Sequence, residues 1–212
     1  MKKNILYTLA MLVFAVANIP AQNNAQAEKI LSDLLLSAKT NAIKTNFKLA
    51  TNDKNNPQGT ITGTFTLKGS KFMLDVVDMK VWFDGKTQWA YNEQNNEVSV
   101  TEPTEKELSE TNPMAILSAY KSKCAVKFSA KAKSAQNHCI EMTPKAKNKD
   151  IAKIEVQVNK TNGNLSSIKL FNTNGSTSVL TTSNFQKGLK IADSFFVFNQ
   201  SRHKGVAIND LR

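Results

Sequence analysis

One short segment, residues 80–92, constrains the fold more than any other part of the sequence. Its centre, Asp84-Gly85, is a strong hairpin signal, because glycine readily takes the positive φ at which the chain reverses. A three-residue loop places three pairs on one face: Phe83 with Thr87, Val81 with Trp89 and Met79 with Tyr91. We therefore expect a hairpin that lays a broad aromatic and apolar surface on one side of a sheet.

The rest of the chain predicts a mainly β (α+β) domain over residues 22–212. Apolar side chains that recur every three or four positions predict an amphipathic helix over residues 25–40. A second helical region is predicted over residues 104–121, where Asn112 is a candidate N-cap and Pro113 suits the first helical position. Alternating apolar residues predict strands at 43–51, 60–68, 72–76, 98–101, 125–130, 139–143, 151–158, 165–172, 176–186 and 195–198.

The amino terminus predicts export. Lys2-Lys3 precedes a nearly uncharged apolar run at residues 5–17, which is short for a bilayer span. We expect a signal peptide of residues 1–21, cleaved after Ala21; cleavage after Ala17 or Ala27 and a retained anchor are the alternatives. Because no cysteine follows the run, lipidation is not expected. The expected location of the mature protein is the periplasm.

Two cysteines, Cys124 and Cys139, flank residues 125–138, which predict a hairpin with its reversal near Lys131-Ala132. In that hairpin the two cysteines would be cross-strand neighbours, and an oxidising compartment allows a disulfide to persist. A disulfide and two free buried thiols both remain open. There is no CxxC motif, so neither a metal site nor a redox site is predicted.

The charge pattern favours a solvated sheet face. The chain carries a formal net charge of +11, and lysines nearly alternate at Lys121, Lys123, Lys127, Lys131 and Lys133. A nucleic-acid groove is disfavoured, because an exported chain meets little nucleic acid and the aromatic residues lie elsewhere. The remaining alternative is a positive face that approaches anionic membrane headgroups or an acidic partner.

Catalysis finds no support in the sequence. The two histidines, His138 and His203, stand in no Ser/His/Asp arrangement and at no metal-ligand spacing. Asp75 and Asp78 point to opposite faces of a strand, and Asp84 is expected to bond its own turn. We therefore expect no enzyme activity, no cofactor and no metal.

Several segments, taken in order, resemble the periplasmic lipoprotein carrier family LolA. They are residues 84–92 (DGKTQWAYN), 97–101, Thr111-Asn112-Pro113, 142–146, 195–198 and 206–212. The resemblance implies an unclosed antiparallel β-barrel, which is a strongly curved sheet, with a helical lid over a hydrophobic cavity. It also implies a monomeric chaperone that shields the acyl chains of lipoproteins and transfers them to the outer membrane. The implied partners are the lipoprotein cargo, an inner-membrane ATP-driven lipoprotein release complex and an outer-membrane receptor.

The candidate lining of the acyl cavity combines the apolar sheet face with the two helical regions. Its residues are Leu31, Leu34, Leu35, Phe65, Leu67, Phe72, Leu74, Val81, Phe83, Trp89, Tyr91, Met114, Ile116 and Leu117. The sequence departs from the family at one place: Gly69 occupies the turn position of an arginine that pairs with the lid. Lys68 and Lys71 cannot reproduce bidentate guanidinium bonding. A carrier or sensor domain that binds another lipid or amphiphile with the same cavity is the alternative function.

Overall fold

The computed structural model describes residues 19–54 and 56–212; the side chains of residues 19–23, 109 and 110 are not described. Residues 1–18 of the expected signal peptide lie outside this range, so cleavage after Ala21 stays a prediction. Helix α1 (Ile19–Thr40) begins earlier than the predicted residue 25 and ends where predicted. In the described part of the chain, no helix combines the length and the hydrophobicity needed to cross a bilayer.

Twelve strands of the described chain form one sheet, in the order β12-β6-β5-β4-β3-β2-β1-β11-β10-β9-β8-β7. Their bounds are β1 (Ala42–Asp53), β2 (Asn56–Lys68), β3 (Lys71–Val76), β4 (Met79–Phe83), β5 (Gln88–Asn92), β6 (Glu97–Thr101), β7 (Cys124–Phe128), β8 (Asn137–Pro144), β9 (Ile151–Asn159), β10 (Leu165–Asn172), β11 (Thr177–Lys187) and β12 (Ala207–Asp210). Neighbouring strands are antiparallel, except that β12 runs parallel to β6.

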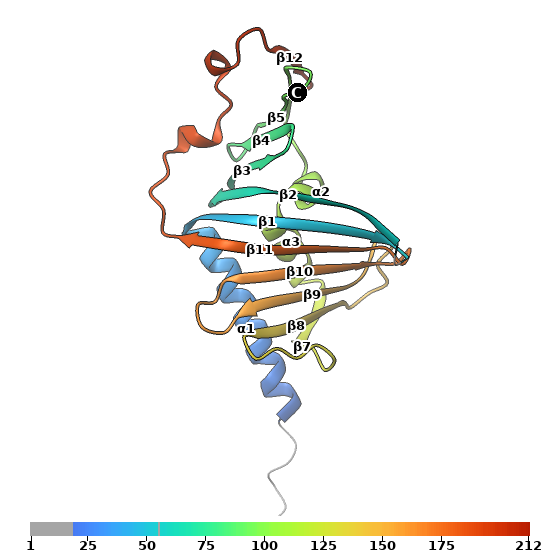
Figure 1. The fold of residues 1–212 in the computed structure, drawn as a ribbon. Helices are drawn as coiled ribbons and strands as arrows, with labels where there is room; N and C mark the ends of the chain where they lie inside the picture. The colour runs from blue at the N-terminus through green and yellow to red at the C-terminus, as the bar shows by residue number, and fades with distance from the viewer. Residues whose placement is uncertain (1–18, 55) are drawn as a thin grey trace, which may run out of the picture.

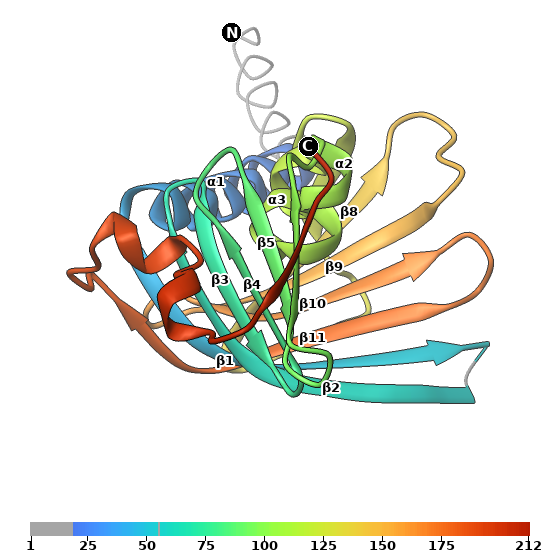
Figure 2. The same ribbon diagram turned by 90° about the horizontal axis from the view of Figure 1, so that it is seen from above.

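The sheet curves strongly and does not close, since β7 and β12 end the strand order without pairing with each other. Figures 1 and 2 show α1, α2 (Glu105–Thr111) and α3 (Pro113–Lys121) on the concave side of the curve. The predicted fold class, an unclosed antiparallel barrel with a helical lid, is confirmed.

The predicted helical region at 104–121 is divided into two helices at Asn112. Thr104 starts α2 with a capping box, in which its hydroxyl and Glu107 satisfy each other's backbone N–H groups. The Asn112 side chain then starts α3 by accepting hydrogen bonds from the backbone N–H of Met114 (2.9 Å) and Ala115 (3.3 Å). Pro113 occupies the start of α3, as the sequence predicts.

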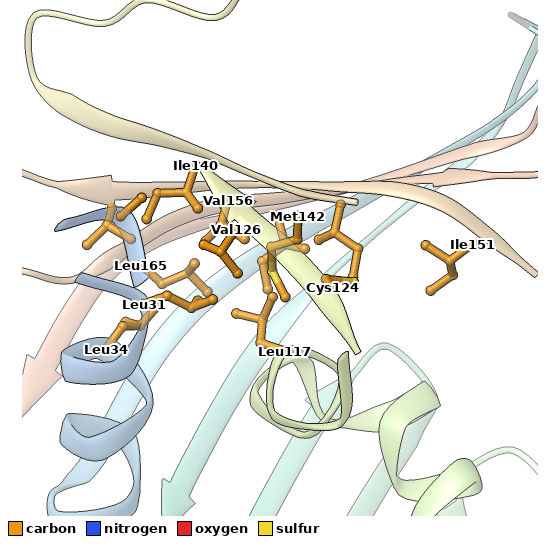
Figure 3. Packing of buried hydrophobic residues seen from close by; sticks show 14 residues of the cluster. Leu31, Leu34, Leu117, Cys124, Val126, Ile140, Met142, Ile151, Val156 and Leu165 are labelled. Carbon is orange, nitrogen blue, oxygen red and sulfur yellow. The ribbon is translucent and has the colours of Figure 1, made fainter. Parts of the chain in front are cut away.

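Two apolar clusters fill most of the space between the concave face and the helices. The first joins α1 and α3 to β7–β10 (Figure 3), and its fully buried members include Leu31, Leu117, Ile140, Met142 and Val156. The second lies against β1–β4, where Phe72 stacks between Phe65 and Phe83 with ring centroids 5.7 and 5.3 Å apart. Each fully buried side chain of this size contributes roughly 1.5–3 kcal/mol, so these clusters hold the lid and the sheet together.

The hairpin at residues 80–92 forms, but with a longer loop than predicted. The Asp84 carboxylate accepts hydrogen bonds from the backbone N–H of Lys86 (2.9 Å) and Thr87 (2.8 Å). Asp84 therefore bonds its own turn, as expected. This turn places residues 84–87 in the loop between β4 and β5, which shifts the strand pairing by one residue.

The shift moves two predicted cavity residues to the other face of the sheet. The observed pairs are Phe83 with Gln88, Trp82 with Trp89, Val81 with Ala90, Lys80 with Tyr91 and Met79 with Asn92. Because side chains alternate along a strand, Trp89 and Tyr91 lie on the convex face, opposite Val81 and Phe83. The prediction of one shared aromatic face was wrong.

A C-terminal strap, residues 188–212, packs on this convex face. Residues 195–198, predicted as a strand, instead belong to the 3₁₀ turn η1 (Asp193–Phe196) and the residues after it. The Trp82 ring lies 5.4 Å from that of Phe198, and the Tyr91 ring lies 4.5 Å from that of His203. Figure 2 shows the strap crossing to β12, which extends the sheet beyond β6. The strap thus covers aromatic side chains that would otherwise face water.

Two lysines fasten the start of the strap. The Nζ atoms of Lys68 and Lys71 lie 2.8 and 2.6 Å from the two carboxylate oxygens of Asp193, and Lys68 also donates to the Ile191 carbonyl at 2.7 Å. Hydrogen bonds from these ammonium groups lower the pKa of Asp193 from 3.8 to about 2. Gly69 sits at the turn between the lysines with φ 62°. The two lysines on either side of this turn therefore bind the strap.

The two cysteines are free and buried. Cys124 pairs with Pro144 and Cys139 with Gln157, so they are not cross-strand neighbours, and the disulfide alternative was wrong. The pairing of β7 with β8 is shifted from the predicted hairpin. Cys139 lies opposite Ser129, and the Ser129 N–H donates to the Cys139 carbonyl at 2.8 Å. Burial raises the pKa of both thiols, which favours the neutral form.

Gly63 is required for space. The other seven glycines of the chain have positive φ, but Gly63 does not. It lies on the concave face of β2, paired with Phe47 and Val76. A Cβ atom there would lie 2.2 Å from the Asp75 carbonyl oxygen and 2.8 Å from a Val76 methyl group. The close approach of β3 to β2 thus needs a residue without a side chain.

We predict that Gly63→Ala destabilises the protein by about 1–3 kcal/mol, because the added methyl forces the end of β3 away from β2. The free energy of unfolding would be measured by urea denaturation. Thr62→Ala, at an exposed position beside it, is the control and should change stability by less than about 0.5 kcal/mol. Equal stability of the two variants would contradict the close approach.

A second prediction concerns the strap and pH. Because the pKa of Asp193 is lowered on folding, its ionised carboxylate stabilises the folded protein. This stabilisation is fully present above pH 3.8 and is lost as the pH falls through about 2. Asp193→Asn should remove the same contribution at neutral pH and expose residues 188–212 to faster proteolysis. The matched control is Asp33→Asn, which breaks an exposed lysine pair on α1. Cleavage of the strap at the wild-type rate would show that the ion pairs do not hold it.

Candidate functional site

A cavity of about 300 Å³ lies between the concave face of the sheet and α3. Strands β1–β4, β10 and β11 form its wall, and the start of α3 forms its cover. Its lining residues are Ile43, Thr45, Phe47, Leu49, Ile61, Phe65, Leu67, Leu74, Val76, Met79, Thr111, Pro113, Met114, Ile116, Leu165, Ile168, Leu170, Ser178, Leu180, Thr182 and Phe185. Met114, Leu180 and Phe185 each pack against both apolar clusters, so the cavity lies where the two clusters meet.

The lining is mainly apolar. None of the described residues that surround the cavity is charged. Three hydroxyl groups bond to the backbone: Thr45 Oγ1 donates to the Ser183 carbonyl (2.8 Å), Thr111 Oγ1 to the Leu108 carbonyl (3.3 Å) and Thr182 Oγ1 to the Leu165 carbonyl. An apolar ligand fits such a surface, since each methylene removed from water contributes about 0.8 kcal/mol.

The cavity opens at one end of the sheet. Deep in the cavity, Phe65 is 6% exposed and Ile168 is 3% exposed. Towards the turns that join β1 to β2 and β3 to β4, Ile61 is 53% exposed and Met79 is 41% exposed. We call this exposed end of the lining the mouth. Large apolar side chains held in water at the mouth extend the cavity surface outward.

The structure distributes the fourteen predicted lining residues over four places. Five of them line the cavity: Phe65, Leu67, Leu74, Met114 and Ile116. Leu31, Leu34 and Leu117 are buried in the first cluster and Leu35 packs against it, while Phe72, Val81 and Phe83 are buried in the second cluster. Trp89 and Tyr91 lie on the convex face. Contact of any of these residues with a ligand stays a prediction.

Sequence reasoning missed the wall formed by β1, β10 and β11. The missed residues include Ile43, Phe47, Leu49, Leu165, Ile168, Leu170, Leu180 and Phe185. Alternation along residues 43–49 and 165–170 could have identified these faces. The pairing of β11 with β1 could not be predicted from local sequence patterns. This pairing joins the two halves of the sheet around the cavity.

No ionisable side chain is among the described residues that line the cavity. Within residues 19–54 and 56–212, no three His, Cys, Asp or Glu side chains come together in a way that could hold a metal ion. Burial lowers the pKa of His138, which lies beside Phe128 with ring centroids 5.9 Å apart. Neither residue lines the cavity.

Two kinds of comparison identify relatives of the chain. Residues 19–174 match the model of a family described as outer membrane lipoprotein carrier protein LolA. No curated protein matches the sequence. The strap lies beyond the matched residues.

Solved structures share the fold at low sequence identity. An uncharacterized conserved protein from Thermus thermophilus has a TM-score of 0.58 at 9% identity, over 87% of this chain and 99% of that chain. The complex of Pseudomonas aeruginosa MucA and MucB gives a TM-score of 0.51 at 12% identity. That match covers 82% of this chain and 62% of the other.

The family match spans most of the chain and includes the cavity cover and much of its wall. It agrees with the resemblance carried by the hairpin and by Asn112-Pro113. The chain belongs to the outer membrane lipoprotein carrier protein LolA family.

Proposed function

We propose that this protein is a periplasmic carrier that shields lipoprotein acyl chains in its cavity and transfers them from the inner to the outer membrane. The observation that supports the proposal most directly is an uncharged cavity, open at one end, in a chain of the LolA family. Acyl chains are costly to expose to water, at about 0.8 kcal/mol per methylene. A carrier with such a cavity would lower that cost during passage through the periplasm.

The cover of the cavity is held by contacts that a ligand can replace. The lining is exposed at the mouth, so an acyl chain can enter the cavity from that end. Met114, Ile116 and Leu117 attach α3 to the domain through apolar contacts, which an entering acyl chain can replace. Loading would therefore displace α3 with little net loss of buried apolar surface.

The proposed partners follow from this path. Cargo would be received from an inner-membrane ATP-driven release complex and delivered to the outer membrane, with an outer-membrane receptor as a further partner. The carrier would act as a monomer and without catalysis, because transfer requires apolar contact at each step and no bond cleavage.

A second candidate function is a carrier or sensor domain for another lipid or amphiphile. The lining favours this alternative in one respect: three of its four hydroxyl groups are bonded to the backbone, so they offer little to recognise a particular headgroup. Native mass spectrometry of protein purified from the periplasm would separate the two. Bound lipoproteins or their acylated amino-terminal peptides support the carrier proposal, whereas a free glycolipid or pigment contradicts it.

We predict that Ile61→Glu lowers affinity for a fluorescent fatty acid by about tenfold or more. An apolar side chain of this size contributes ~1.5–3 kcal/mol when buried by ligand, and ~1.4 kcal/mol corresponds to tenfold. Since Ile61 is already 53% exposed, the melting temperature should change little.

Leu36→Glu is the matched control, because Leu36 is 59% exposed on α1 and does not line the cavity. This variant should bind the probe as the wild type does. Equal affinity of the two variants would place the ligand outside the cavity.

A further inference from the structure

The end of the sheet where the cavity opens also carries a group of exposed lysines. The α3–β7, β8–β9, β10–β11 and β1–β2 connections meet along this end, as shown by the pairs Cys124 with Pro144, Asn172 with Ile151 and Thr177 with Asn52. Figure 2 shows the last three connections side by side. The exposed lysines on them, which we call the mouth lysines, are Lys54, Lys123, Lys145, Lys147 and Lys149.

The charge of the mouth lysines is largely uncompensated. Asp53 at the end of β1 and Asp150 in the β8–β9 connection lie near these lysines, and Asp78 lies in the β3–β4 turn, where it accepts a hydrogen bond from Gln94 at 2.8 Å. None of the mouth lysines forms a salt bridge within the described chain; Lys145 Nζ donates to the Ser122 carbonyl at 3.3 Å. By contrast, Lys127 and Lys153 on the convex face pair with glutamates. The mouth lysines therefore present a positive rim to solvent.

Apolar side chains are exposed on the same side of the molecule, set back from the lysines along β2, since the end of β3 pairs with Gly63 and not with the start of β2. Ile61 and Met79 are exposed at the mouth, and Val77, in the turn between β3 and β4, is 79% exposed. A positive rim with exposed apolar side chains near it suits a membrane interface, where phosphate headgroups lie above the acyl chains.

We propose that the mouth end docks directly on an anionic phospholipid bilayer, with the mouth lysines among the headgroups. This inference rests on the proposed carrier function, for which it supplies a route between cavity and bilayer. The cations of the rim are all lysines, which are mobile point charges without a fixed fork of donors. They suit a diffuse layer of lipid phosphates better than the defined carboxylates of an acidic protein surface.

The test uses the exported protein and vesicles of phosphatidylcholine with or without phosphatidylglycerol, in co-sedimentation at physiological salt. The mouth variant carries Lys54→Glu, Lys147→Glu and Lys149→Glu. The matched control carries Lys131→Glu, Lys133→Glu and Lys190→Glu, which make the same charge change at exposed positions on the opposite end of the sheet. Residues that are the same in the wild type, the mouth variant and the control contribute equally to vesicle binding, so differences in affinity report only the substituted lysines.

The wild type should bind the phosphatidylglycerol vesicles at least about tenfold more tightly than phosphatidylcholine alone. The mouth variant should lose about tenfold or more of this affinity, and the control less than about threefold. Equal loss in both variants would show that net charge alone attracts the protein and would overturn the proposal. Absence of wild-type binding would also overturn it and leave an acidic protein as the occupant of this end.

The same proteins are then tested for fatty-acid binding. Because no mouth lysine lines the cavity, all three should bind the fluorescent probe equally. A mouth variant that keeps probe binding but loses vesicle binding supports docking. If the wild type binds the probe but not the vesicles, the docking proposal is overturned and the carrier proposal stands. If the wild type binds the vesicles but not the probe, only the carrier proposal is contradicted.

Discussion

The structure depends on one constraint: the apolar concave face of an unclosed sheet must be covered by only three helices. Helix α1 and the end of α3 fill the curve over β7–β10, and the stacked rings of Phe65, Phe72 and Phe83 fill it near β2–β4. Between these two clusters the start of α3 spans the face without filling it. The cavity is the space that remains, so its position follows from how little helix the chain supplies.

Apolar surface on the convex face must also be covered, and the two halves of the sheet differ in how much of it they carry. Over β7–β10 it is polar, with Lys127, Glu141 and Lys153 in contact, and it needs no cover. Over β4–β6 it carries Trp82, Tyr91 and buried valines, and here the strap covers it. The strap ends as β12 beside β6, so it also protects an edge that would otherwise expose unpaired backbone groups. Both faces of the hairpin are thus apolar, and each has its own cover.

Much of the fold was predictable, because local signals and tertiary packing agree in most of the chain. The helix start at Asn112-Pro113 and the alternation of most strands carried the prediction, and the ordered resemblance supplied the curvature. The register of the hairpin was not predictable from Asp84-Gly85 alone. Both loop lengths reverse the chain there. In the observed register the Asp84 carboxylate bonds the N–H groups of Lys86 and Thr87, and the strap gives Trp82 and Tyr91 ring partners on the convex side. The wall at β10 and β11 was missed for a related reason, since the pairing of β11 with β1 joins residues far apart in sequence.

The corrected register also bears on how the lid is held. With Trp89 and Tyr91 on the convex face, the cavity wall is mainly aliphatic, and Lys68 and Lys71 bind Asp193 of the strap. The start of α3 then meets the wall through Met114 and Ile116, with contacts of the same kind that an acyl chain would make. In the proposed carrier, opening and loading would be one exchange of apolar contacts, in which the buried area lost at the lid is regained on the ligand. Such an exchange would keep the free-energy difference between the empty closed and the loaded open states small, as release of the cargo requires.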